Sequence, residues 1–185
     1  MLSGERLTHA GRYFRVVQAQ LYSLPQERPK LLAAAIDTRA AARLAPQVDG
    51  LITVSQPQAK LRDVIAAFRD AGGDRKPLFL QAKHSYADNE ERALQGAFDQ
   101  WRTNLGPGLV SANLALPEQF DAAARFVRPE DMRDSVRISS EPERHAEWLA
   151  GDLELGFDRD YVHNVNRELE RFIDTFAEQV LPRLS

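Results

Sequence analysis

Length and composition indicate a single soluble globular domain. The chain has 185 residues, of which 43% are hydrophobic, 28% charged and 8% aromatic, so it can bury a core of its own. The absence of cysteine excludes disulfides, thiolate nucleophiles and cysteine-ligated zinc or iron-sulfur sites. Any redox chemistry must therefore come from a bound cofactor.

Neither a membrane segment nor a nucleic-acid surface is expected. The longest uninterrupted apolar run, Leu31 to Ile36, is far shorter than the ~20 residues of a membrane helix, and residues 1–5 show no signal region, which predicts a cytoplasmic protein. A net charge of -3 and a pI near 5.8 give no broad positive field, so nucleic acid is not an expected partner. The four histidines lack metal-ligand spacing, and no metal is predicted.

The chain order alternates strands with helices after an N-terminal hairpin. Residues 4–17 place two β-prone runs around a glycine-containing turn, which predicts the hairpin. Strands are predicted over 31–36, 50–54, 78–83 and 159–165, each followed by a helix. Apolar runs without polar alternation are typical of strands covered on both faces of a parallel sheet. A Gly/Pro-punctuated loop over 105–117 and an extra helix interrupt this alternation after the third unit.

Four strand-helix units predict an α/β protein with parallel strands and right-handed crossovers. Two architectures fit: an open doubly wound sheet, or part of a (β/α) barrel, which normally needs eight strands and ~250 residues. Length favours the open sheet, but the glycine-rich phosphate motifs of nucleotide-binding sheets are absent.

Three stretches carry a more specific pattern, and together they cover nearly the whole chain. They are Gly4-Glu5-x-x-Thr8-His9-x-Gly11-x-Tyr13-Phe14, then Leu32-Ala33-Ala34-Ala35 with Asp49-Gly50-Leu51-Ile52-Thr53, and finally Leu155-Gly156-Phe157-Asp158 with Val162-His163-Asn164-Val165. This pattern resembles the bacterial-luciferase-like family of flavin- and deazaflavin-dependent oxidoreductases.

The resemblance implies that the chain is the C-terminal half, strands five to eight, of a luciferase-like TIM (β/α)8 barrel. Residues 1–185 then form one partial barrel domain, with a hairpin and lead-in (1–30), three βα units (31–103), an insertion (104–136) and a last helix-strand-helix segment (137–185). It also implies an oxidoreductase of monooxygenase type that uses FMN or a deazaflavin coenzyme, a small-molecule substrate, and a flavin reductase as a partner.

Polar residues at the C-terminal ends of the strands are the candidate site residues, because barrel active sites lie there. The cofactor-binding candidates are Asp37, Thr38, Thr53 and Asn164, and the catalytic candidates are His84 and His163. The resemblance implies that the turn at Asp37 and Thr38 presents backbone N–H groups to the flavin phosphate. Asp37 would repel a phosphate, however, and is equally typical of a plain helix N-cap.

The two histidine candidates each have a structural alternative. Lys83 and His84 are adjacent, so only one of them faces the barrel interior, and we expect it to be His84, acting as an acid or base near neutral pH. At this strand end a cation such as Lys83 could also pair with a phosphate or an acidic substrate. The structural alternative is a surface Lys83 beside a hydrogen-bonded His84. The resemblance makes His163 a pocket residue; the alternative is that it ties the last loop to the barrel rim.

A non-enzymatic interpretation competes with the oxidoreductase. Four strands leave two open edges and an apolar inner face, which solitary soluble proteins avoid exposing. A catalytically inactive half-barrel is then expected to form a homo-oligomer, or to pair with a chain that supplies the missing N-terminal half. A third interpretation, a complete small α/β domain that binds a nucleotide, predicts a sheet covered on both faces.

Overall fold

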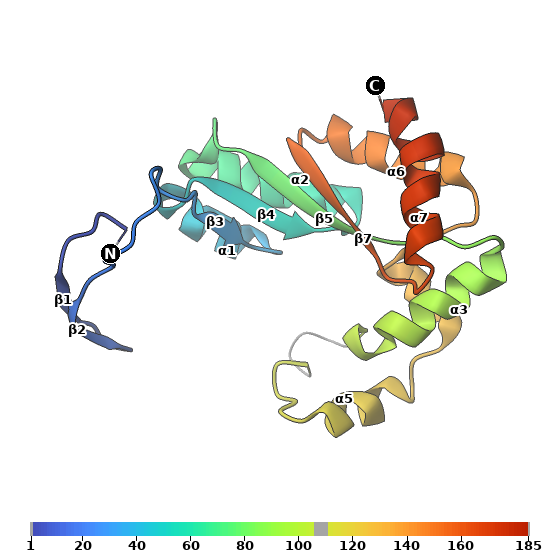
Figure 1. The fold of residues 1–185 in the computed structure, drawn as a ribbon, viewed down its shortest axis with the longest axis horizontal. Helices are drawn as coiled ribbons and strands as arrows, with labels where there is room; N and C mark the ends of the chain where they lie inside the picture. Colours follow the sequence, from blue (N-terminus) through green and yellow to red (C-terminus); the bar gives the residue numbers. More distant parts are fainter. Residues whose placement is uncertain (1, 106–110, 185) are drawn as a thin grey trace.

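A computed structural model describes residues 2–105 and 111–184. The predicted hairpin is confirmed: β1 (Leu7–Ala10) pairs antiparallel with β2 (Arg15–Ala19), and it stands apart from the rest of the chain (Figure 1). Part of the predicted loop over 105–117 lies outside the described residues. Among the described helices, none combines the length and apolarity needed to cross a bilayer.

The main sheet has five parallel strands, and the four longer ones lie in the order in which they occur along the chain. They are β3 (Leu32–Ala34), β4 (Gly50–Val54), β5 (Leu78–Ser85) and β7 (Arg159–Asn164). β5 pairs with β4 along its first half and with the short β6 (Arg137–Ile138) at its end, and β7 pairs with β5 along the other edge. The first strand of this sheet lies at an edge, so the strand order is not that of a mononucleotide-binding sheet.

Helices separate the strands. They are α1 (Thr38–Leu44), α2 (Gln58–Phe68), α3 (Glu90–Trp101), α5 (Pro117–Ala124), α6 (Pro142–Glu154) and α7 (Leu169–Thr175), with a 3-10 helix over Pro129–Asp134. Asp37 caps α1 by accepting a hydrogen bond from the Ala40 N–H (2.8 Å), as the plain N-cap interpretation predicts. Asn89 caps α3 by accepting a hydrogen bond from the Arg92 N–H (2.9 Å).

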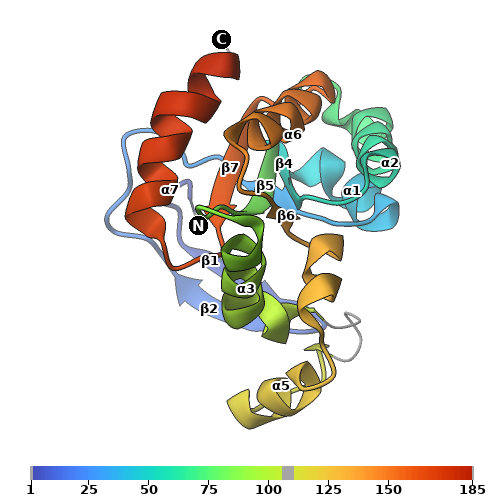
Figure 2. The same cartoon turned by 90° about the vertical axis from the view of Figure 1, so that its right-hand side faces the viewer.

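One face of the sheet is covered by helices of this chain (Figure 2). Alternate residues of β3, β4 and β5 pack with the apolar sides of α1 and α2, and α6 continues this layer toward β7. The fully buried side chains of this core include Leu51, Leu61, Val64, Phe68, Leu78 and Leu80. Since β strands point successive side chains to opposite faces, this packing fixes which residues face the other way.

The opposite face, called here the open face, is largely uncovered by the described residues, except near the ends of β5 and β7, where α3 packs against it. Ile36 is 54% exposed and Tyr161 47% exposed, and Leu32 is also exposed on this side. The prediction that each strand is covered on both faces is therefore wrong within this chain. The apolar runs are uninterrupted because the residues on the open face are also apolar, although most of them have no packing partner among the described residues.

A buried charged network joins the covered face to α6. Arg137 Nη2 donates to Asp152 Oδ1 (2.8 Å), and its other terminal nitrogen contacts the second oxygen of the same carboxylate. Asp160 points into this layer from β7, and its two carboxylate oxygens are buried without a hydrogen-bond partner among the described residues. Burial and the neighbouring Asp152 carboxylate raise the pKa of Asp160 to about 8.

Replacing Asp160 by Asn is expected to stabilise the fold at alkaline pH. Folded Asp160 keeps its proton up to about pH 8, whereas the unfolded residue loses it above about pH 4, so its contribution to stability falls as pH rises through this window. Thermal unfolding should show Asp160→Asn melting about 2–4 °C above the wild type at pH 8, with a smaller gain at pH 5. The exposed-site control Asp121→Asn should match the wild type, and an Asp160→Asn variant that melts lower at pH 8 would contradict a buried, protonated Asp160.

The open face is expected to drive self-association. Light scattering should detect species larger than a monomer, because burying Ile36 and Tyr161 removes apolar surface from water. The double variant Ile36→Ser/Tyr161→Ser should associate at least tenfold more weakly. The control Phe126→Ser removes a side chain that is 88% exposed near α5 and should leave association unchanged. A monodisperse wild-type monomer in light scattering would contradict this expectation.

Candidate functional site

A shallow pocket lies on the open face at the C-terminal ends of β3 and β4. Its volume is about 430 Å³, within the usual range for small-molecule sites. Ala34, Ile36, Ile52 and Val54 provide a mostly apolar surface, and Gln81 adds an amide from β5. An apolar surface with few polar groups suits one face of a planar aromatic ring.

The Asp37 turn borders this pocket but offers little to a phosphate. The Asp37 carboxylate already occupies the N-terminus of α1, where it accepts from the Ala40 N–H, and it adds a negative charge there. Thr38, the first residue of α1, is exposed. The two residues are thus placed beside the pocket, and their predicted role toward a phosphate gains no support from their hydrogen bonds.

His163 and Lys83 lie next to each other on the open face. They are paired residues of β7 and β5, so their side chains point to the same side of the sheet. The ring of Trp101, at the end of α3, stands edge-on to His163 with 5.1 Å between the ring centroids. His163 Nδ1 is buried without a hydrogen-bond partner among the described residues. This arrangement places a cation and an imidazole at the C-terminal end of the face that carries the pocket.

Two other candidates direct their side chains to the covered side of the sheet. Thr53 is among the residues that line the open-face pocket, but its side chain is buried toward the helices, with Oγ1 unpartnered in the described part of the chain. Asn164 closes a local turn: its Nδ2 donates to the Asn166 carbonyl (3.0 Å), and its Oδ1 accepts from the Asn166 N–H (3.3 Å). These two residues are therefore not brought together with His163, and their positions favour structural roles.

His84 is also on the covered face, which reverses the expected orientation of Lys83 and His84. Its side chain is 0% exposed and lies among the rings of His145, Trp148 and Phe176. The cause is the strand alternation, since Leu78, Leu80 and Ala82 already point to the covered side. The position of His84 thus fits the structural alternative and gives no support to a catalytic role.

His84 and His145 form a buried imidazole pair. His145 Nε2 donates to the Ser139 carbonyl (3.0 Å), because a carbonyl only accepts, so the neutral ring has an acceptor at Nδ1. The Nδ1 atoms of the two rings are 2.8 Å apart, which makes His84 Nδ1 the donor. Burial lowers the pKa of His145, and burial together with the charges of His145 and Arg137 holds the pKa of His84 well below its usual range.

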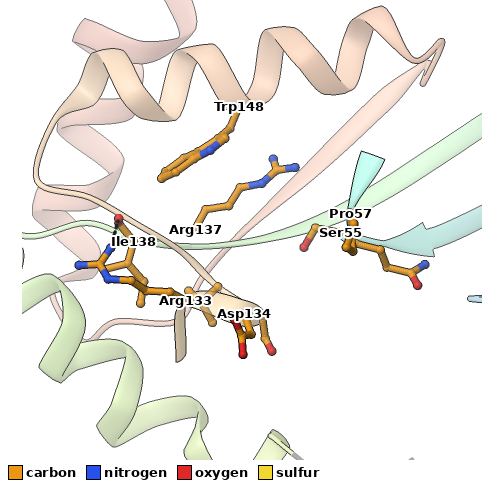
Figure 3. A pocket seen from close by; sticks show the side chains of 10 residues that line it. Ser55, Pro57, Arg133, Asp134, Arg137, Ile138 and Trp148 are labelled. Atoms are coloured by element: carbon orange, nitrogen blue, oxygen red, sulfur yellow. Dashed lines mark hydrogen bonds between the residues drawn. The ribbon is translucent and has the colours of Figure 1, made fainter. Parts of the chain in front are cut away.

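A second pocket, of about 340 Å³, lies beyond the end of β4, between the β6 segment and α6 (Figure 3). Ser55 and Trp148 line it, and Arg137 points toward α6 below Trp148 (Figure 3). Its two arginines are already engaged, Arg137 by Asp152 and Arg133 by the Glu90 carboxylate (3.0 Å) and the Ile138 carbonyl (3.2 Å). Both arginines of this pocket are therefore already used in ion pairs within the chain. The open face remains the better candidate site.

Three open-face residues were not among the predicted site residues: Gln81, Lys83 and Trp101. The alternation of β5 contains the signal for the first two. Once Leu80 and Ala82 are assigned to the helical layer, Gln81 and Lys83 must face the other side. Trp101 is brought to His163 by tertiary packing of α3, and strand periodicity carries no signal for it.

The buried imidazole pair predicts a loss of stability in acid. Below about pH 6.5 the histidines of the unfolded chain take up protons that His84 and His145 resist in the fold, so the unfolded state gains stability. In an Asp160→Asn background, which removes the opposite pH dependence of Asp160, urea denaturation should show a decrease of about 1 kcal/mol or more between pH 7.5 and 5.5. His145→Gln, whose amide can donate to Ser139 and accept from His84, should reduce this decrease, whereas His9→Gln in the exposed hairpin should not. Equal pH dependence in all three proteins would refute the assignment.

Comparison with known sequences identifies the family. The sequence model of the family described as luciferase-like monooxygenase matches residues 1–159. A relative from Nakamurella multipartita, named F420-dependent glucose-6-phosphate dehydrogenase, is 30% identical over 98% of this chain and 56% of its own length. The chain thus spans about half the length of the curated relatives it matches.

Solved structures share the fold. An F420-dependent secondary alcohol dehydrogenase in complex with an F420-acetone adduct superposes with a TM-score of 0.85 at 19% identity, over 97% of this chain and 56% of that one. The oxygenating constituent of 3,6-diketocamphane monooxygenase from Pseudomonas putida, in complex with FMN, superposes with a TM-score of 0.55 at 12% identity, over 100% and 60%. These structures resemble the α/β fold with its parallel sheet, and the sequence match carries the assignment: the chain belongs to the luciferase-like monooxygenase family.

Proposed function

We propose that this chain carries part of the coenzyme and substrate site of a deazaflavin (F420)-dependent oxidoreductase. The 30% identical relative is named as an F420-dependent dehydrogenase, and so is the structure with a TM-score of 0.85. The observation that carries the proposal is the apolar pocket on the open face, at the C-terminal ends of β3 and β4. Active sites of parallel α/β enzymes lie at this end of the strands.

The open-face pocket fits the coenzyme ring better than its phosphate. When bound, a deazaflavin supplies hydride transfer, and a flavin supplies hydride transfer or oxygen activation. Ile52 and Val54 would hold one face of the ring and keep water from it, and the Gln81 amide could donate to or accept from a polar ring edge. The phosphate does not fit at α1, because Asp37 already occupies that helix end.

The type of reaction is the second element of the proposal. We infer hydride transfer of the dehydrogenase type, on a small-molecule substrate, because the relatives that match most of this chain are named dehydrogenases. The monooxygenase type with FMN, expected from the resemblance, is supported by the family description and by the FMN-bound fold relative. That reaction would bring in a flavin reductase as a partner. A cytoplasmic location accords with either type.

The architecture proposed for this function is the second half of a barrel. Four parallel strands follow one another in sequential order, as consecutive strands of a barrel do, and only one face of the sheet is covered. The chain covers 56% of the first relative. A second polypeptide segment or a second copy would then cover the open face and complete the site.

Coenzyme binding by the purified chain tests the proposal. Titration with oxidised F420, followed by coenzyme fluorescence, should saturate, and Val54→Trp should weaken binding at least tenfold because the larger ring fills the pocket. The control Leu153→Trp adds the same ring on exposed α6 and should bind as the wild type does. A parallel FMN titration distinguishes the two reaction types. Absence of saturable binding of both coenzymes would overturn the proposal.

The exposed apolar face supports a second candidate, a non-catalytic half-barrel that self-associates or pairs with another chain. Its supporting observation is the combination of exposed Ile36 and Tyr161 with free edges at β3 and β7. This candidate predicts association without coenzyme binding. The titration and light scattering together therefore separate it from the oxidoreductase.

A further inference from the structure

Lys83 is a half-buried cation without a counter-charge. It makes no hydrogen bond and no ion pair with any of the residues in 2–105 and 111–184. Burial, and the positive charge of Arg137 nearby, both lower the pKa of Lys83, which is the effect of an environment that lacks negative charge. The Asp152 carboxylate pairs with Arg137, and Asp160 lies on the covered side of the sheet, so neither of these carboxylates pairs with Lys83.

The strand residues of the open face include no carboxylate. The side chains that β3, β4, β5 and β7 direct to this face are Leu32, Ala34, Ile52, Val54, Phe79, Gln81, Lys83, Ser85, Arg159, Tyr161 and His163. The only charged groups in this set are the cations Lys83 and Arg159. The Asp37 carboxylate borders the face beyond β3, at the opposite edge of the sheet from β7, so the β5–β7 part of the face has the positive charge and low polarity that attract an anionic ligand.

His163 lies beside Lys83 and adds a second hydrogen-bond donor at this position. It pairs with Lys83 across the two strands, which places the two side chains side by side. Its Nδ1 is buried without a partner, so a proton there would be an unsatisfied donor, and the neutral ring is best protonated at Nε2. The imidazole then offers Nε2–H as a donor to a ligand oxygen beside the Lys83 ammonium.

The α3 helix packs against the open face next to Lys83 and His163. The next residue on this side of β5, Ser85, is buried, and its Oγ donates to the Ala93 carbonyl of α3 (2.7 Å) and accepts from Asn166 Nδ2 (3.1 Å). Trp101, from the same helix, packs its ring against His163. A ligand group at Lys83 is thus shielded from solvent on the α3 side, which strengthens its electrostatic interaction with the ammonium.

We propose that Lys83 and His163, under Trp101, form a subsite for an oxyanion of the substrate, a carboxylate or phosphate group. Lys83 contributes the charge and His163 a directional hydrogen bond. The subsite lies at the same end of the open face as the coenzyme pocket, and Gln81, two residues before Lys83 on β5, borders that pocket. This inference rests on the proposed function for the identity of the ligand as substrate, whereas oxyanion binding itself does not require the coenzyme.

Trp101 provides a direct test, because the chain contains only two tryptophans. In a Trp148→Phe background, Trp101 is the sole indole reporter, and inorganic phosphate or acetate is added at constant ionic strength with chloride as the balancing anion. We expect a saturable change in Trp101 fluorescence with at least one of the two oxyanions. Lys83→Gln should weaken binding at least tenfold, and His163→Phe about threefold or more. Lys60→Gln, on the exposed side of α2, is the matched control and should bind as the background protein does.

Imidazole NMR of the otherwise unaltered chain gives an independent measurement if Trp148→Phe does not fold. The oxyanion should shift the ring resonances of His163 and leave those of buried His84 and His145 unchanged. Equal affinities in Lys83→Gln and Lys60→Gln, or no effect of either oxyanion on Trp101 and His163, would overturn the subsite. Because no coenzyme is present, failure of this experiment is distinct from failure of the F420 titration.

Discussion

The alternation of side chains across four parallel strands, with helices of this chain on one side only, determines most of the molecule. It places Leu51, Leu78 and Leu80 in a conventional core and leaves Ile36 and Tyr161 exposed on the other side. The same alternation sorts the polar residues. Groups directed toward the helices must find partners within the chain, whereas groups on the open face are available to a ligand or to another polypeptide.

Much of the fold follows from the sequence. The strands at 50–54 and near 159–164, the hairpin and the Asp37 cap are found as predicted, because short apolar runs and capping residues act locally. The face on which each side chain lies was less predictable. An apolar run does not indicate which side of the sheet each of its residues faces, so the sequence predicts the wrong face for His84. Tertiary packing of His84 against His145 and Phe176 determines its side.

Two groups of unusual residues have different meanings for function. His84, His145 and Asp160 are buried and remote from the open face, so their altered pKa values reflect the cost of burying polar groups in the helical layer. Lys83 and His163 lie on the open face, near an apolar pocket. The proposed site residues therefore rest on position relative to the sheet and not on the size of a pKa shift. The family assignment supports the same end of the sheet as the place of chemistry.

The separation of β5 from β7 along the chain has a consequence for folding. β3, β4 and β5 are joined by short connections, so these units can dock one after another with little loss of chain entropy. β7 can pair with β5 only when the two ends of the segment 86–158 meet, which costs loop-closure entropy. The β5–β7 pair is nevertheless the longest ladder of the sheet. The last strand is thus expected to join late, and the β5 edge stays unpaired while the loop organises.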